Sequence, residues 1–486
     1  MSGRAGAVLS GMRWGAIGVG VSVVVQIGLM ACLSRLLTPA DFGLMAMALI
    51  GLRFLDYFAQ MGLGPALVHR PDLSRQDIRL GLGLSLLVSG ICVGLTWLLA
   101  PLAAGFFQRP ALSGILDVLA LNFLLQGLST VALALLRRGL RFRALALIDL
   151  AAYVIGYGAV GLALAWAGAG VWALVCATLA QSGLSLLLAG ALARHDWRPS
   201  LRGDVRGLLG YGAPHSLVSF VEFLSFNVDT TLIGRLMGDA PLGTYSRARL
   251  LTNLPTEKVA GILGRVLFPL FSHAQTQRAQ VGQGFLLGVL GIGLAGAALS
   301  LGMAAAAGPL VAVMLGPQWQ DAVPLVGALA LCVPFLYMGH VAGVVCDALA
   351  LLRSKLLLQG AALVLLMASV WLALPRGMTA VVWVVLAVEA LRWIAFLLLL
   401  VPVLQLTWRE VARVHLAVAA MGALVWTGVR AALAWQDGTP GAALAIAVLA
   451  GALSALLALG LVRPLLRPIA AYGLLRSRLP ALARWW

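Results

Sequence analysis

Long apolar stretches alternate with short polar connections along the whole chain. A helix that crosses the hydrocarbon core of a membrane needs about 20 predominantly apolar residues. Stretches of this length predict fourteen membrane-spanning helices, so we expect an all-α polytopic membrane protein. The predicted spans lie near residues 13–36, 43–68, 78–100, 112–136, 144–166, 170–193, 208–236, 241–272, 283–307, 322–350, 356–374, 379–404, 411–431 and 441–462.

The seventh and eighth predicted spans carry ionisable side chains far from their ends. These are Glu222 and Asp229 in the seventh span, and Arg247, Arg249, Glu257, Lys258 and Arg265 in the eighth. A charged side chain at the centre of a bilayer costs at least about 2.5–3.5 kcal/mol, so such groups normally face a protein interior or a water-filled cavity. Charges of both signs in two adjacent spans predict a polar cavity inside the protein.

A sequence repeat relates the two halves of the chain. The first copy lies at the end of the first span and comprises Arg35–Leu37 followed by Phe42–Gly43. The second copy lies at the end of the seventh span and comprises Arg235–Met237 followed by Leu242–Gly243. Six spans separate the two copies, so both copies run in the same direction through the membrane. Such repeats are typical of transporters, in which the substrate site lies between the two lobes.

The repeat predicts two pseudo-symmetric six-helix lobes around a central cavity, followed by two further helices. We expect the lobes at residues 1–206 and 207–405, and the last two helices with a basic, amphipathic tail at 406–486. Most of the 34 lysine and arginine residues lie in alternate connections, on the side of the predicted N-terminus. Because basic residues mark cytoplasmic loops, this bias predicts that both termini are cytoplasmic. The basic tail is expected to contact membrane lipids.

The composition agrees with a membrane protein. Hydrophobic residues make up 62% of the chain and charged residues 10%, with a mean hydropathy of +1.00, whereas soluble domains are about a quarter charged. The net charge of +17 would suggest nucleic-acid binding in a soluble protein. In a membrane protein the cytoplasmic arginines account for it, so no nucleic-acid partner is expected.

Sequence motifs for catalysis and cofactors are not found. Neither Lys258 nor Lys355 follows a glycine, which excludes a phosphate-binding loop of the GxxxxGK type. The five cysteines lie in apolar stretches without paired spacing and are expected to be packing residues. We therefore expect no metal, no cofactor and no enzymatic activity.

Four cations are candidates for binding a phosphate-bearing substrate, because guanidinium and ammonium groups are the usual partners of phosphate oxygens. They are Arg53, Arg247, Arg249 and Lys258. A structural role is the alternative for each of them. Arg247 could extend to the membrane surface, and Arg53 could pair with Asp56, which follows it by three residues on the same helix face.

Four further polar residues are candidates for cavity lining or ion coupling, namely Asp56, Glu222, Asp229 and Asn253. A buried carboxylate can carry a proton or hold a sodium ion. The alternative for Asp229 and Glu222 is that they are charge partners of the cations in the eighth span. Glu389 and Arg392, three residues apart in the twelfth span, are expected to form an internal ion pair.

Several motifs resemble those of a known family. They are Asn227–Leu236 with Leu242–Tyr245, Arg35–Gly43, Leu140–Leu145 and Phe268–Ser272. In their order and spacing, the chain resembles the Wzx-type polysaccharide flippases, in the colanic-acid exporter-like branch of the multidrug/oligosaccharidyl-lipid/polysaccharide exporter superfamily. The resemblance covers nearly the whole chain.

This resemblance implies a function. Members of the family carry oligosaccharide repeat units on undecaprenyl diphosphate from the cytoplasmic to the periplasmic leaflet of the cell inner membrane, by alternating access, for exopolysaccharide or lipopolysaccharide synthesis. A polysaccharide polymerase and co-polymerase are the implied partners. Related lipid II flippases use arginines in early spans and in the eighth span, which by topology points to Arg53 and to Arg247 or Arg249.

Other functions are also compatible with the sequence. A multidrug or cation antiporter of the same superfamily would favour an acidic cavity, whereas this one is more basic. A lipid II flippase is a second alternative within the superfamily. A polytopic glycosyltransferase or polymerase belongs to another class, and would normally show acidic residues in sizeable loops outside the membrane. A non-transport assembly scaffold would not need buried charges.

Overall fold

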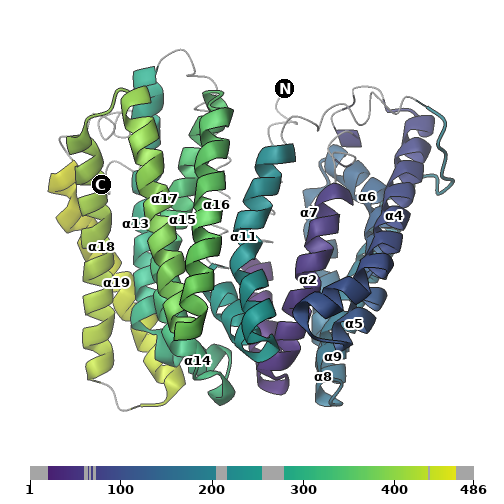
Figure 1. Ribbon diagram of the computed structural model, residues 1–486, viewed down its shortest axis with the longest axis horizontal. Helices are drawn as coiled ribbons and strands as arrows, with labels where there is room; N and C mark the ends of the chain where they lie inside the picture. The colour runs from purple at the N-terminus through teal and green to yellow at the C-terminus, as the bar shows by residue number, and fades with distance from the viewer. Residues whose placement is uncertain are drawn as a thin grey trace. The chain divides into compact units, whose positions relative to one another are not determined.

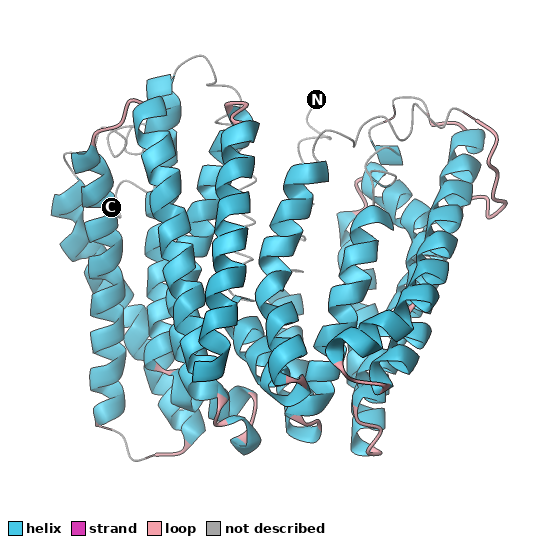
Figure 2. Cartoon of the chain, in the orientation of Figure 1, coloured by secondary structure: helices cyan, strands magenta, loops and turns pink. Residues whose placement is uncertain are grey.

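The computed structural model describes residues 20–59, 64, 67–68, 70, 73–203, 216–253, 278–435 and 438–466. These residues form helices joined by short loops, and no strand occurs among them (Figure 2). The predicted all-α class is therefore confirmed.

The helices of the first half follow the predicted spans. They are Gly20–Leu36, α2 (Pro39–Ala59), α4 (Arg75–Phe107), α5 (Ala111–Leu119), α6 (Leu121–Arg138), α7 (Phe142–Tyr153), the π-helix η1 (Val154–Gly161), α8 (Leu162–Trp166) and α9 (Val171–Ala193). The long helix α4 begins at a capping box, in which the Ser74 side chain accepts from the Asp77 backbone N–H and Asp77 accepts in return from the Ser74 backbone.

The helices of the second half are also close to the predicted ranges. They are α11 (Ser216–Met237), a helix over 239–253, α13 (Arg278–Ala305), α14 (Ala307–Met314), α15 (Ala322–Ala348), α16 (Leu352–Ala373), α17 (Met378–Val403), α18 (Trp408–Ala434) and α19 (Pro440–Leu466). Two short 3₁₀ turns lie at Pro317–Trp319 and Leu374–Arg376.

Ten helical stretches among the described residues are long and apolar enough to cross a membrane. The protein is thus a multi-pass membrane protein. The other four predicted spans, near 13–36, 43–68, 208–236 and 241–272, each extend into residues outside the described ranges. The count of fourteen spans therefore stays a prediction.

The chain divides into two compact units. Unit 1 comprises Met1–Phe223 and Ile233–Gly243, and unit 2 comprises Leu224–Leu232 and Thr244–Trp486. Two segments from the start of the predicted second half, residues 207–223 and Ile233–Gly243, are therefore part of unit 1. The predicted lobe boundaries at 206 and 405 stay predictions, as does a central cavity between the lobes.

Helices α4, α6 and α9 pack side by side in unit 1. Gly127 in α6 makes the close approach to α4 possible, since an added Cβ would lie 2.2 Å from the hydroxyl oxygen of Ser89. The buried hydroxyl of Ser85 on α4 donates a hydrogen bond of 2.9 Å to the Gly127 carbonyl. A small residue and a hydroxyl at the contact are typical of helix packing in membranes.

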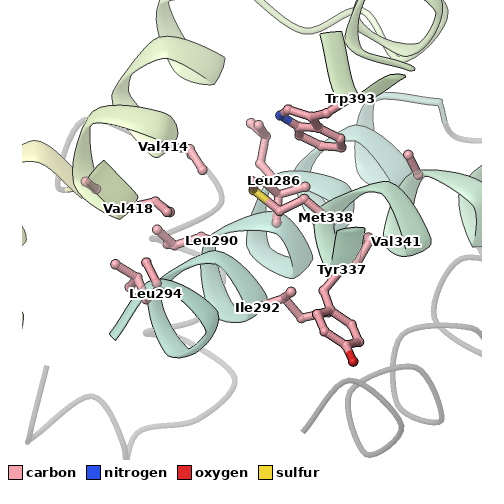
Figure 3. Packing of buried hydrophobic residues seen from close by; sticks show 14 of the residues in the cluster. Leu286, Leu290, Ile292, Leu294, Tyr337, Met338, Val341, Trp393, Val414 and Val418 are labelled. Carbon is pink, nitrogen blue, oxygen red and sulfur yellow. The ribbon is translucent and has the colours of Figure 1, made fainter. Parts of the chain in front are cut away.

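A large buried cluster lies in unit 2, where α13 packs against α15 and α18, and α15 packs against α17 (Figure 1). Leu286, Met338 and Trp393 meet in its interior (Figure 3). The Trp393 indole N–H donates to His415 Nε2 at 2.8 Å, and His415 Nδ1 lies 2.7 Å from the Val411 carbonyl. These partners fit a neutral imidazole that carries its proton on Nδ1, so the histidine completes the core of unit 2.

The two copies of the sequence repeat contact each other inside unit 1. An added Cβ at Gly43 would lie 1.8 Å from the Asp239 carbonyl oxygen, and one at Gly243 would lie 1.7 Å from the Pro39 carbonyl oxygen. Backbone therefore meets backbone at both glycines. We call residues Ile233–Gly243 the tip segment, because they comprise the end of α11, the turn at Gly238 and the start of helix 239–253.

An ion pair also holds the tip segment. Arg109 Nε donates to Asp239 Oδ2 at 3.1 Å, and Arg109 Nη2 donates to Asp239 Oδ1 at 3.0 Å. Partial burial alone would raise the pKa of Asp239, but the hydrogen bonds and charge of Arg109 outweigh this and hold the pKa below its ordinary value. Nearby, the Arg235 guanidinium lies 5.5 Å from the centre of the Phe106 ring.

Replacing Asp239 by asparagine is expected to lower the free energy of unfolding by at most about 1 kcal/mol, because half-exposed ion pairs contribute little. A lowered carboxyl pKa stabilises the fold above the ordinary pKa, and this stabilisation is lost as the pH falls through the lowered value. Thermal unfolding in detergent at pH 7.5 and in acid measures both effects. A difference between the variant and the unsubstituted protein that grows on acidification would contradict this role of the pair.

Candidate functional site

A buried ion pair connects α11 to the helix over 239–253 within unit 2. Arg249 Nη1 donates to both carboxylate oxygens of Asp229, at 3.0 and 2.9 Å, and Arg249 Nη2 donates to the Phe226 carbonyl at 2.9 Å. Asp229 is only 3% exposed. Charges removed from water are normally paired in this way, because an unpaired buried charge is strongly destabilising.

Tyr245 and Thr230 also donate hydrogen bonds to the Asp229 carboxylate. The Tyr245 hydroxyl donates to Asp229 Oδ2, and the Thr230 backbone N–H donates to Asp229 Oδ1 at 2.7 Å. Tyr245 and Arg249 are four residues apart, so they lie on one face of their helix. The turn at Gly238, with a φ of +90°, returns the chain so that this face meets α11.

A second ion pair lies on α17. Arg392 Nη2 donates to Glu389 Oε2, three residues earlier on the same helix. Glu389 is buried, with 8% of its surface exposed. The internal ion pair expected from the sequence is therefore confirmed.

Both ion pairs line one pocket of unit 2. The pocket has about 530 Å³ of empty space, including its open mouth, and its other polar lining residues are Ser225, Tyr245, Asn253 and Cys332. Apolar side chains of α15, α16 and α17 form the rest of the wall. Two carboxylates and two guanidinium groups give the pocket a formal charge of zero, so it is polar without carrying an excess of either sign.

The structure brings together only part of the predicted cation set. Arg249 lies in the pocket and is paired, and Arg247 is half-buried on the same helix. Arg53 is an exposed residue of α2 in unit 1. Lys258 lies outside the described residues. Phosphate binding by these four residues stays a prediction.

The structure also places only part of the predicted polar set at the pocket. Asp229 and Asn253 line the pocket. Asp56 and Glu222 lie in α2 and α11, but their side chains are outside what the structure describes. The alternative for Asp229, that it is the charge partner of a cation in the next span, matches its geometry. Ion coupling by this set stays a prediction.

Several polar pocket residues were absent from the predicted site, namely Ser225, Tyr245, Cys332, Glu389 and Arg392. For Tyr245 a sequence signal existed, because it lies one turn before Arg249 on the same face. For the α17 pair the sequence indicated the ion pair but not its place in this pocket. Within the described residues, no group of three or more histidine, cysteine or acidic side chains is arranged to hold a metal ion.

Comparisons with known proteins complete the description. A family model described as "Polysaccharide biosynthesis protein" matches residues 32–324. The teichuronic acid biosynthesis protein TuaB of Bacillus subtilis is 26% identical over 67% of this chain and 68% of its own length. The Escherichia coli lipopolysaccharide biosynthesis protein WzxC is 26% identical over 65% of each chain. The succinoglycan biosynthesis transport protein ExoT of Rhizobium meliloti is 29% identical over 62% of this chain and 60% of its own.

Solved structures share the fold. The lipid II flippase MurJ, in an inward closed conformation, superposes with a TM-score of 0.71, covering 92% of this chain and 98% of its own, at 12% identity. An inward-facing multidrug resistance transporter of the MATE family superposes with a TM-score of 0.58, covering 81% of this chain and 94% of its own, at 15% identity. At these identities the likeness describes the fold alone.

Proposed function

Because the chain belongs to the polysaccharide biosynthesis protein family, we propose that it is a flippase for lipid-linked oligosaccharides. The substrate is an oligosaccharide repeat unit on undecaprenyl diphosphate, which crosses from the cytoplasmic to the periplasmic leaflet of the inner membrane. Both termini lie in the cytoplasm. The family match over more than half of the chain carries this proposal, and the apolar helices and the flippase-like fold support it.

Alternating access explains how a polar glycan crosses the bilayer. The diphosphate binds cationic side chains, the glycan occupies a hydrated cavity, and the lipid tail stays in the bilayer. Outward movement of an anion from a negative-inside cell is assisted by about 2.3 kcal/mol per charge per 100 mV. No covalent step is needed, so the protein acts as a carrier and not as an enzyme.

Several cations are proposed to bind the headgroup together. Arg53, Arg247 and Lys258 are proposed to contact the diphosphate, together with Arg249 when it leaves Asp229. Asp56, Glu222 and Asn253 are proposed to line the glycan path. The exposure of Arg53 supports its role, because an exposed guanidinium in a membrane-length helix needs an anion or water as its partner.

Replacing Arg53 by alanine is expected to reduce polymer export by about tenfold or more, since one charge-assisted hydrogen bond contributes about 1.5–3 kcal/mol. Export is measured in a strain that has this chain as its only flippase. Arg53→Lys should retain part of the activity, because it keeps the charge. Arg75→Ala is the matched control, since Arg75 is an exposed arginine at the start of α4. Full export by Arg53→Ala would remove this residue from the proposed site.

Vesicle transport tests the function itself. Purified protein is reconstituted with a fluorescent oligosaccharide on undecaprenyl diphosphate, and a glycosidase outside the vesicles reports which molecules have crossed. Protein-dependent crossing is expected, without efflux of cationic dyes. Dye efflux with no lipid movement would favour a multidrug antiporter and overturn the proposal. Crosslinking in cells tests the proposed contacts with a polymerase and co-polymerase.

A further inference from the structure

The Asp229–Arg249 pair has the geometry of an anion site that is occupied by the protein's own carboxylate. Arg249 contacts both carboxylate oxygens at 2.9–3.0 Å. A phosphate group offers the same chemistry, because it also presents two anionic oxygens to the N–H groups of a guanidinium. Asp229 and a diphosphate therefore compete for one cation.

The two partners differ in their access to the pocket. The Arg249 side chain is 22% exposed, whereas the Asp229 side chain is 5% exposed. An anion that enters the pocket therefore reaches the guanidinium without first displacing the carboxylate from the protein interior. The Tyr245 hydroxyl and the Thr230 backbone N–H also donate hydrogen bonds to the Asp229 carboxylate and hold it in place.

When Arg249 leaves, the buried Asp229 carboxylate has lost its counter-charge. A carboxylate that is buried without a counter-charge is strongly disfavoured, and it takes up a proton instead. The titratable and charged groups of the pocket that face Asp229 are Tyr245 and Arg249 from helix 239–253, Cys332 from α15, and Glu389 and Arg392 from α17.

The Glu389–Arg392 pair differs from the Asp229–Arg249 pair because both of its partners lie on one helix. Glu389 and Arg392 lie three residues apart on one helix, so they stay together when neighbouring helices move. The partners of the first pair come from two helices joined by a turn, and their bond can open by a small shift. Of the two pairs that line the pocket, the Asp229–Arg249 pair is therefore the one suited to exchange.

We propose that Asp229 is an internal substitute for the substrate's headgroup. It occupies Arg249 when no substrate is bound. The diphosphate takes its place on Arg249, and the freed carboxylate takes up one proton from water on an Oδ atom. Substrate release reverses both steps. This inference rests on the proposed function, and it assigns a coupling residue to that function.

Proton uptake on binding gives a direct test. The full-length protein in nanodiscs is titrated calorimetrically with undecaprenyl diphosphate in buffers of different ionisation enthalpy. About one proton should be taken up per lipid bound, beyond the uptake seen for Asp229→Asn. By linkage, the affinity of the unsubstituted protein should then fall by about tenfold per pH unit relative to this variant.

The variant and its control separate the outcomes. Asp229→Asn keeps the hydrogen bonds to Tyr245 and Thr230 within reach, and thermal unfolding checks that it folds. Asp239→Asn is the matched control, because it removes the acid of another aspartate–arginine pair, and it should behave as the unsubstituted protein. Should Asp229→Asn destabilise the protein, the pH dependence of the unsubstituted protein is compared with that of Asp239→Asn and free lipid alone.

Equal proton uptake by the unsubstituted protein and Asp229→Asn would overturn the exchange while leaving the flippase intact. Failure of both proteins to bind undecaprenyl diphosphate would also overturn it, because Arg249 would then not be a diphosphate site. The vesicle assay described above decides separately whether lipid-linked oligosaccharide is moved. The two proposals therefore fail in different experiments.

Discussion

Gly243→Ala is expected to prevent the tip segment from docking, with a loss of at least about 3 kcal/mol in the free energy of unfolding. The new methyl group would lie 1.7 Å from the Pro39 carbonyl oxygen. Both sides of this contact are backbone, so no side-chain rotation can relieve the overlap. Gly43→Ala should have the same effect, since its methyl group would lie 1.8 Å from the Asp239 carbonyl oxygen.

Fluorescence-detected size-exclusion chromatography after heating measures this loss. Gly291→Ala is the matched control, because Gly291 lies in α13 and its added Cβ would meet nothing within 4 Å. An alanine there should be neutral or slightly stabilising. If Gly243→Ala and Gly291→Ala unfolded at the same temperature, the close backbone contact would not exist in the protein.

Arg249→Ala is expected to lower the free energy of unfolding by about 3–5 kcal/mol, because it leaves the Asp229 carboxylate buried without its cation. Polymer export should fall below detection. The effect exceeds that of Asp239→Asn, whose partner Arg109 is 39% exposed on its side chain. The comparison therefore separates a buried pair from a half-exposed one.

The double variant Asp229→Leu/Arg249→Met separates stability from transport. Buried ion pairs can often be replaced by apolar residues without loss of stability, so the double variant should unfold near the temperature of the unsubstituted protein. Export should nevertheless stay absent, because the headgroup would have lost this cation. Recovery of export in the double variant would contradict any role of the pair in transport.

Much of the fold follows from the apolar pattern, and the family resemblance is confirmed by the family match. Local chemistry sets the details that the pattern misses. Helix α4 begins at Arg75, earlier than the predicted 78, because Ser74 caps it, and it continues through Pro101 to Phe107. The π-helix Val154–Gly161 was also missed. Gly156 there packs against α9, where an added Cβ would lie 2.7 Å from the Ala177 carbonyl oxygen, and such tertiary contacts leave no periodic signal.

The candidate site was predicted in part for a similar reason. Asp229 and Arg249 lie on consecutive helices, so their pairing could be foreseen as an alternative. Glu389 and Arg392 follow about 140 residues later, and only the packing of α17 in unit 2 places them at the same pocket. The sequence also could not show whether Arg249 is available to a phosphate group or is already paired with a carboxylate. That depends on the 2.9 Å contact between Arg249 and Asp229, which lie on two different helices.

Because the tip segment belongs to unit 1, the chain passes from one unit to the other on both sides of this segment. The residues on both sides of it, Leu232 and Thr244, belong to unit 2. Any rocking of one unit against the other must therefore flex the chain at these two junctions, as in hinge motions that a few residues absorb. Asp229 and Tyr245 lie within one helical turn of the junctions. Flexing there would strain the hydrogen bond that Tyr245 donates to Asp229, so a rocking motion would act directly on the contacts that hold this carboxylate.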